Sequence, residues 1–168
     1  MSTDDEYQWL SPLEHALHRP DTYAGGINPV ETTGVSFITS EDGKRLAGAC
    51  QTADISPALF KVIDEPIQNA MDNRSRDDSQ TYIRMSFDEA GVFSIVNDGH
   101  TIPVRLWKDS DRYTHEILFS ELMSGENFND AKKRIDVGGR NGLGIKITAL
   151  LSSEFVVESV NLEPSLLF

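Results

Sequence analysis

The chain has 168 residues, of which 39% are hydrophobic, and it carries 27 acidic against 15 basic side chains, a net charge of −12. That length suits one globular domain, and the apolar fraction is sufficient for a buried core, so wholesale disorder is excluded. The surplus of carboxylates argues against a domain that binds nucleic-acid phosphates directly. The single Cys50 excludes an internal disulfide and provides no CxxC spacing for structural zinc.

The first ten residues form a polar, acidic arm that carries Tyr7 and Trp9. A secretory signal would be basic and then apolar, and no apolar run in the sequence reaches the roughly 18 residues that a membrane span requires. We therefore expect an intracellular protein, in the cytoplasm or the nucleus, that is neither secreted nor bound to a membrane.

A helix, a turn and a hairpin are predicted next. The helix begins at the capping box Ser11-Pro12-Leu13-Glu14 and ends before Pro20, because a residue that precedes proline avoids the α conformation. Residues 20–26 predict a turn. Residues 35–39 predict a strand, and the segment Glu41-Asp42-Gly43-Lys44 that follows predicts a hairpin turn.

A second helix begins with a cap and a proline at Ser56-Pro57. Its core-facing stripe is apolar and consists of Leu59, Ile63, Ile67 and Ala70. Two strands at 81–87 and 92–96 predict an antiparallel hairpin that packs on helices through Ile83, Met85 and Phe87.

The remaining predicted elements are a helix at 115–123, a polar lid at 124–139, a helix at 143–151 and a strand at 155–160. The lid is too long for a simple connection, which is typical of a functional loop. The order of elements indicates one α+β domain over residues 1–168, a sandwich of mixed, mostly antiparallel sheet with helices on one face.

Polar side chains follow one face of the second helix. They are spaced at i, i+4, i+7 and i+8: Glu65, Asn69, Asp72 and Asn73. Because unpaired buried polar groups are costly, such a stripe indicates either a site or a solvated face beside Arg74. In a site, Glu65 would activate water and Asn69 would complete the oxygen shell of a metal.

Two glycine-containing segments are candidate ligand contacts. Asn97-Asp98-Gly99 follows a strand, where a carboxamide can present an acceptor to an adenine amino group; an ordinary turn is the alternative. Gly138 to Lys146 holds four glycines before a helix, which indicates a phosphate cradle flanked by Arg140 and Lys146; a glycine-rich loop without ligand is the alternative. The second segment is neither a P-loop nor a dinucleotide fingerprint.

Together these motifs resemble the GHKL ATPase family, with its Bergerat ATP-binding fold. From about Tyr7 to Val160, the chain is similar to the N-terminal ATPase domain of a type IIA DNA topoisomerase of eukaryotic or viral type. The segments that carry the resemblance are Leu13-Glu14-His15, Arg19-Pro20-Asp21-Thr22-Tyr23, Asp64-Glu65, Asn69-Ala70-Met71-Asp72-Asn73, Asn97 with Ile102-Pro103, and Gly138 to Lys146. Histidine kinases, heat-shock chaperones and mismatch-repair ATPases share the Glu/Asn helix or the glycines but lack the Arg-Pro-Asp-Thr-Tyr segment.

The resemblance implies ATP and Mg²⁺ as cofactors. It implies that Glu65 is the general base, that Asn69 binds Mg²⁺ and phosphate, and that Asn97 contacts the adenine or its associated water. It also implies that Tyr7 reaches the nucleotide of the other subunit in a dimer closed by ATP. The other residues expected at the nucleotide are Asp72, Asn73, Glu126, Asn127, Gly139, Arg140, Asn141, Gly142, Leu143, Gly144, Ile145 and Lys146.

The sequence departs from the family pattern at several places. Pro66 follows the expected base and should kink its helix, at a cost of about 3 kcal/mol unless the context absorbs it. Thr101 replaces a glycine of the family's Gly-x-Gly turn, and Gly125 replaces a hydroxyl residue of the lid. The family's domain continues into further strands and a transducer domain whose lysine contacts the γ-phosphate, and residues 161–168 contain neither those strands nor a lysine.

We therefore expect Mg-dependent ATP hydrolysis by the N-terminal gate of a type IIA topoisomerase. Closure of a homodimer would capture a DNA segment that the remaining domains or subunits pass, so that this chain contacts DNA only indirectly and cannot cleave it alone. The alternative is a truncated, non-catalytic relative that acts as a nucleotide sensor or through protein contacts, which Pro66 and Thr101 favour. A chaperone or kinase branch of the same family is a third interpretation.

Overall fold

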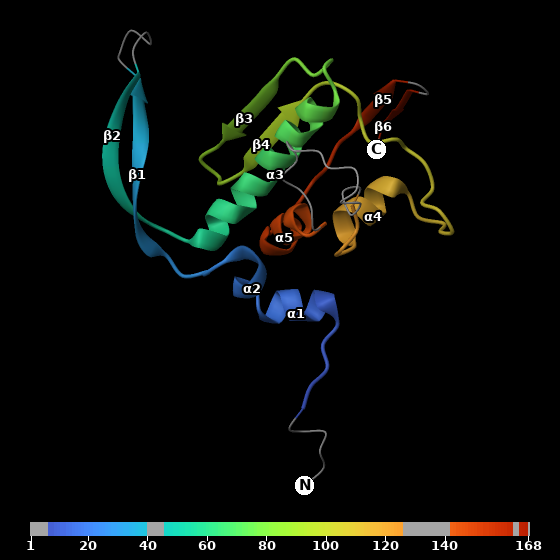
Figure 1. Ribbon diagram of the computed structural model, residues 1–168, viewed down its shortest axis with the longest axis horizontal. Coiled ribbons are helices and arrows are strands. Elements are labelled where there is room, and N and C mark those ends of the chain that lie inside the picture. The colour runs from blue at the N-terminus through green and yellow to red at the C-terminus, as the bar shows by residue number, and fades with distance from the viewer. Residues whose placement is uncertain (1–6, 40–45, 126–141, 163–164, 168) are drawn as a thin grey trace.

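The computed structural model describes residues 7–39, 46–125, 142–162 and 165–167, and one long helix organises the body of the molecule (Figure 1). This helix, α3 (Pro57–Arg76), contacts both α5 (Gly144–Leu151) and the hairpin of β3 (Ile83–Phe87) and β4 (Phe93–Asn97). The short helix α4 (Thr114–Ser120) packs on α5 from the other side. Helices and antiparallel hairpins share one body, so the α+β class is confirmed.

The described strands form three separate antiparallel pairs. β1 (Val30–Thr39) pairs with β2 (Leu46–Ile55), β3 pairs with β4, and β5 (Val160–Leu162) pairs with β6 (Ser165–Leu167). The β1–β2 hairpin projects from the body, as the blue and teal ribbon of Figure 1 shows. The predicted turn at 41–44 lies outside the described residues.

The N-terminal helix α1 (Pro12–His18) confirms the predicted capping box. The Ser11 hydroxyl accepts a hydrogen bond from the Glu14 backbone N–H at 3.3 Å, and the Glu14 carboxylate accepts from the Ser11 backbone N–H at 2.8 Å. The segment 20–26 is more than the predicted turn, because it contains the single helical turn α2 (Asp21–Ala24). His15 Nδ1 and the Tyr23 hydroxyl, 2.8 Å apart, join α1 to α2.

The buried core is small and consists mostly of alanine. Ala16 of α1, Ala24 of α2, Ala58 of α3 and Ile147 of α5 form one cluster, surrounded by the half-buried side chains of Tyr23, Leu122 and Leu150. Alanine has a short side chain, so the backbones of the helices approach closely where these residues meet. The core therefore joins the N-terminal helices directly to α3 and α5.

The connection between α2 and α3 is clamped at the base of the β1–β2 hairpin. Gly26 O accepts hydrogen bonds from the Ala58 backbone N–H and from the Ser56 hydroxyl, each at 3.1 Å. Gly25 has a φ of +85°, and a Cβ there would lie 3.3 Å from Pro57 Cβ. The chain thus leaves and re-enters the body at one point.

Helix α3 continues through Pro66 as one 20-residue helix, although a proline inside a helix should disrupt it. Pro66 has no N–H to donate to the Val62 carbonyl, four residues earlier. The Thr148 hydroxyl of α5 donates to Val62 O at 3.2 Å instead. A contact between the two helices thus replaces the hydrogen bond that the proline removes.

Further predicted elements differ from the structure. Residues 155–159 form no ladder, and pairing begins only at Val160, so the predicted strand at 155–160 is wrong. Helix α4 ends at Ser120 instead of residue 123, where Met123 has a positive φ of 62°. Met85 and Phe87 of β3 are exposed whereas Ile83 is half-buried, so the prediction that all three pack on helices is wrong for Met85 and Phe87.

Candidate functional site

The carboxylate of Glu65 lies at the junction of α3 and α5. Its side chain is 15% exposed and forms an ion pair with Lys61, one turn earlier on the same helix. A Cβ added to Gly144 would lie only 1.5 Å from Glu65 Oε2, so the carboxylate packs against the first residue of α5. The carboxylate thus lies beside the N-terminal end of α5.

Lys146 lies in the first turn of α5 and is 4% exposed. Burial lowers the pKa of its ammonium group to about 8, because desolvation penalises the charged form. Its Nζ donates to the backbone carbonyl of Ser124 at 2.5 Å, and Met123 N donates to Gly142 O at 3.2 Å. The start of the predicted lid is thus tied to the glycine segment that precedes α5.

The polar stripe of α3 matches neither of its two interpretations completely. Asn69, one turn after Glu65, is exposed, whereas Asp72 is 1% exposed and accepts a hydrogen bond from Gln68 Nε2 at 2.8 Å. Asn73 is half-buried. The stripe therefore passes from a solvated face at Asn69 to a buried contact at Asp72.

A second polar cluster joins the end of α3 to the end of β4. Gln80, which is 3% exposed, accepts hydrogen bonds from Asn73 Nδ2 at 2.7 Å and from Asn97 Nδ2 at 3.5 Å. Its own Nε2 donates to Ala70 O at 3.0 Å. Asn97 thus shares a partner with a residue of the helix that carries Glu65.

The turn after Asn97 is held by two carboxylates. Asp77 accepts from the His100 backbone N–H at 2.5 Å, which is the main reason that its pKa lies well below the ordinary value. Asp98 accepts from the Thr81 hydroxyl at 2.6 Å, and this bond is the first cause of its lowered pKa. Gly99 has a φ of +100°, and a Cβ there would lie 2.4 Å from Asp77 Oδ2, so the turn requires glycine.

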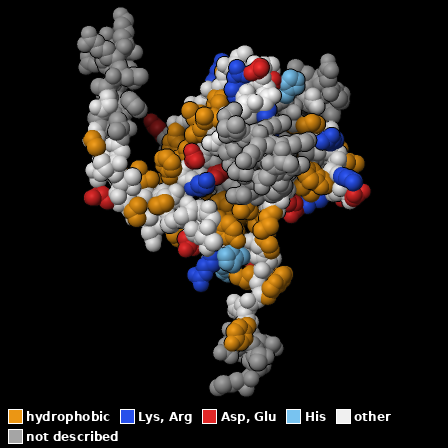
Figure 2. Space-filling view, in the orientation of Figure 1, with side chains coloured by type: hydrophobic (Ala, Val, Ile, Leu, Met, Phe, Trp, Pro, Cys, Tyr) orange, Lys and Arg blue, Asp and Glu red, His pale blue; other side chains and the backbone are white. Residues whose placement is uncertain are grey.

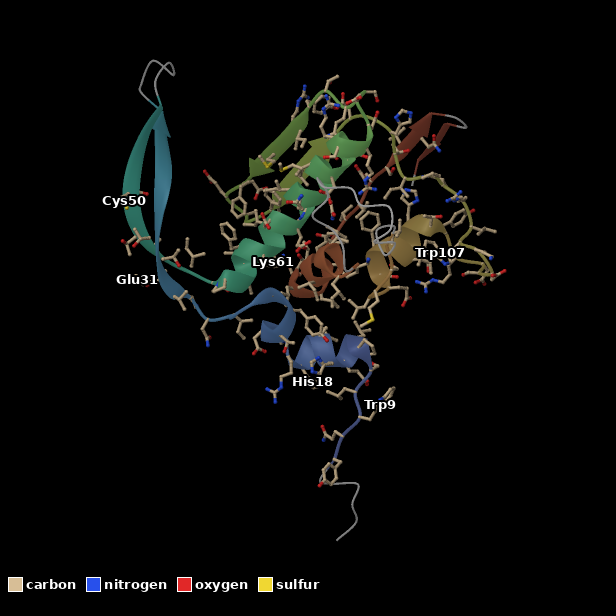
Figure 3. All side chains as sticks on the ribbon, in the orientation of Figure 1. Trp9, His18, Glu31, Cys50, Lys61 and Trp107 are labelled. Atoms are coloured by element: carbon tan, nitrogen blue, oxygen red, sulfur yellow. The ribbon has the colours of Figure 1, made fainter. Side chains whose placement is uncertain are left out.

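The remaining predicted residues are distributed over three regions. Tyr7 is 76% exposed on the N-terminal arm, together with Trp9, which Figure 3 labels on the opposite side of α1 from Lys61. The space-filling view shows hydrophobic side chains in orange along the arm (Figure 2). Gly142, Leu143 and Ile145 are half-buried around the start of α5. Glu126, Asn127, Gly139, Arg140 and Asn141 lie outside the described residues.

The sequence motifs did not identify three side chains that contact the site. Lys61 could have been found, because it lies four residues before Glu65 on a predicted helix, a spacing typical of ion pairs. Gln80 and Thr148 give no local signal, because Ala70 and Val62, the carbonyls to which they donate, are 10 and 86 residues away.

In the described part of the chain, no three His, Cys, Asp or Glu residues converge as a metal site. None of the described helices is long and apolar enough to cross a membrane.

Comparison with known proteins gives consistent results at the level of sequence. The chain is 40% identical over 162 residues to DNA topoisomerase 2 of Meyerozyma guilliermondii, a match that covers 96% of this chain and 11% of that protein. It is 38% identical over 160 residues to DNA topoisomerase 2-beta of Gallus gallus, covering 95% of this chain and 10% of that protein. No model of a protein family matches the sequence.

Solved structures show the same relationship. The ATPase and transducer domains of DNA topoisomerase II from Balamuthia mandrillaris match 98% of this chain with a TM-score of 0.84 and 36% identity. The homologues of this chain are type II DNA topoisomerases. The ATPase region of Saccharomyces cerevisiae topoisomerase II also matches, with a TM-score of 0.84, 36% identity and 97% of this chain.

The match to the topoisomerase II ATPase region confirms the predicted fold. The chain covers 41% and 42% of those two solved chains, and about a tenth of the curated topoisomerases that it matches. Within that part, the structure brings together Glu65 and Gly144 at the start of α5, and Asn73 and Asn97 around Gln80 near the C-terminal end of α3.

Proposed function

We propose that this chain binds ATP with Mg²⁺ and hydrolyses it as the nucleotide-operated gate of a type II topoisomerase. The observation that carries the proposal is the position of Glu65, whose carboxylate packs against the start of α5 two residues before Lys146. Phosphoryl transfer needs groups that position the reactants and stabilise charge, and a carboxylate beside a helix N-terminus with a lysine in the first turn of that helix provides such groups.

The residues at this place fit a Mg²⁺–nucleotide complex. Backbone N–H groups in the first turn of α5 and the Lys146 ammonium are donors for phosphate oxygens. The carboxamide oxygen of Asn69 is exposed one turn after Glu65, and oxygen atoms of this type are the ligands that Mg²⁺ prefers. When bound with ATP, Mg²⁺ would neutralise charge on the phosphates.

Glu65 is the proton acceptor in this proposal. One carboxylate oxygen accepts a proton from the water that attacks the terminal phosphate, which is general-base catalysis. The ion pair with Lys61 and the contact with Gly144 hold the carboxylate in this position. A water held beside Asn69, one turn later on α3, would be the nucleophile that this base deprotonates.

Dimerisation is the second part of the proposal. Trp9 and Tyr7 are 86% and 76% exposed on an arm that extends away from the body, and exposed aromatic side chains are typical of interaction surfaces. We infer that the arm contacts a second copy of the chain when ATP binds, with Tyr7 at the partner's nucleotide. DNA would be contacted by other domains or subunits, in keeping with the net charge of −12.

Titration of the 168-residue chain with a non-hydrolysable ATP analogue and Mg²⁺ tests the binding step. We expect saturable binding, and Asn69→Ala should weaken it by about tenfold or more, since it removes a ligand of both metal and phosphate. The absence of saturable binding to the unmodified chain would show that the proposal is wrong. Sedimentation of the same samples tests dimer closure, which Tyr7→Ala should weaken.

Phosphate release under saturating ATP tests the role of Glu65. Glu65→Gln should lower turnover by about a hundredfold or more while binding is preserved. Asp64→Asn is the matched control, because Asp64 is the exposed neighbour of Glu65 and its substitution removes the same charge. Binding of ATP without turnover in the unmodified chain would support the nucleotide sensor instead.

A further inference from the structure

Gln80 is a buried polar side chain that the proposed mechanism does not use. It lies in the connection between α3 and β3 and is 3% exposed. A buried carboxamide is costly unless both its oxygen and its nitrogen are hydrogen-bonded. Its nitrogen donates to a carbonyl of α3, and its oxygen accepts from one side chain of α3 and one of β4.

The orientation of the Gln80 carboxamide is fixed by the backbone. Its Nε2 donates to the carbonyl oxygen of Ala70 at 3.0 Å, and a carbonyl can only accept. The Oε1 atom must therefore face the opposite direction, where Asn73 Nδ2 donates to it at 2.7 Å. The position of one helix carbonyl thus determines which atom Gln80 presents to β4.

That oxygen and the Asp98 carbonyl together orient the Asn97 carboxamide. Asn97 Nδ2 donates to Gln80 Oε1 at 3.5 Å and to the Asp98 carbonyl at 3.1 Å, which uses both of its amide hydrogens. The Oδ1 atom of this exposed side chain remains for a ligand, and it can only accept. A free asparagine could rotate and present either a donor or an acceptor.

We propose that Gln80 is a positioning residue that, with the Asp98 carbonyl, holds Asn97 as an acceptor and so strengthens the preference of the site for a 6-aminopurine base, adenine, over a 6-oxopurine. The exocyclic amino group of adenine donates to Asn97 Oδ1, whereas the carbonyl oxygen of guanine at the same place would meet another acceptor. The inference rests on the proposed function, since it names the residue that determines base selectivity at the proposed nucleotide site. Specificity of this kind comes from an unfavourable contact with the wrong base.

The test is the ratio of affinities for non-hydrolysable analogues of ATP and GTP, measured with Mg²⁺ on the full chain. Gln80→Met keeps the approximate volume but removes the acceptor, and it should lower the ATP-to-GTP preference by about tenfold. Gln80→Glu keeps an oxygen that can accept from Asn97 but loses the donor to Ala70 O, so its ratio should fall less than that of Gln80→Met. Gln51→Met, on the exposed face of the projecting hairpin, is the control.

A ratio of affinities is insensitive to the fraction of folded protein, because unfolded chains weaken both affinities equally. An unchanged ratio in Gln80→Met would overturn the inference while leaving ATP binding intact. A chain that binds neither analogue would refute the proposed function and this inference with it.

Discussion

The hydrogen bond from Thr148 to the Val62 carbonyl makes a quantitative prediction about Pro66. The bond is 3.2 Å long, and Thr148 is 5% exposed, so Thr148→Val conserves the side-chain shape and leaves Val62 O without that donor. An unsatisfied carbonyl of this kind costs about 1–3 kcal/mol. We expect the free energy of unfolding to fall by that amount in urea denaturation followed by circular dichroism.

The same substitution in a Pro66→Ala background isolates the cause. The alanine restores a backbone N–H that donates to Val62 O. In this background Thr148→Val should lower the free energy of unfolding by about 0.5 kcal/mol or less. The double-mutant cycle should therefore give a coupling energy of about 1 kcal/mol or more between Pro66 and Thr148. Thr52→Val, which removes an exposed hydroxyl bonded to Thr33, is the control and should cost at most about 0.5 kcal/mol.

Equal costs of Thr148→Val in the two backgrounds would refute this account. The Thr148 hydroxyl also lies 3.4 Å from Gly144 O in its own helix, and a bond to that carbonyl would be independent of Pro66. The cycle therefore distinguishes a contact that supports α3 from one that is confined to α5.

Three further substitutions and titrations test the rest of the site. Gly144→Ala places a Cβ 1.5 Å from Glu65 Oε2 and should abolish ATP turnover in a phosphate-release assay, whereas Gly34→Ala, with no atom within 4 Å, should leave it unchanged. Lys146 loses its charge as the pH rises through about 8, so the affinity for ATP should fall from about pH 7 to 9; a flat titration profile contradicts this. Asp77 has a lowered pKa, so it contributes stability above its ordinary pKa of 3.8 that is lost as the pH falls. Asp77→Asn should therefore flatten the dependence of Tm on acid pH, and equal slopes would argue against the role of its carboxylate.

The sequence predicted the elements whose signals are local. The capping box at Ser11 and the proline after Ser56 mark the starts of α1 and α3, and alternation of apolar residues marks the β3–β4 hairpin. In each case the decisive partner is within a few residues, so propensity and pattern suffice. The sequence placed Glu65 on the second predicted helix, and the structure adds its contact with Gly144.

The features that the sequence did not predict depend on distant partners. Pro66 indicated a disrupted helix, and the compensating hydroxyl of Thr148 lies 86 residues from the carbonyl that it satisfies. Gln80 is one polar residue in a short connection, and its role appears only when α3 and β4 are side by side. The strand expected at 155–160 has β-branched residues but lacks a neighbouring strand to pair with before Val160 in the described part of the chain.

The clamp at Gly26 has a consequence for how the chain tolerates change in length. Because Ser56 and Ala58 close on Gly26, the whole β1–β2 hairpin is an excursion from a nearly continuous path between α2 and α3. The entropy of closing such an excursion grows only slowly with its length, by about 0.6 kcal/mol for each doubling. Insertions and deletions in the hairpin should therefore leave the geometry around Glu65 in place. The length of the hairpin can vary without changing the contacts of Glu65.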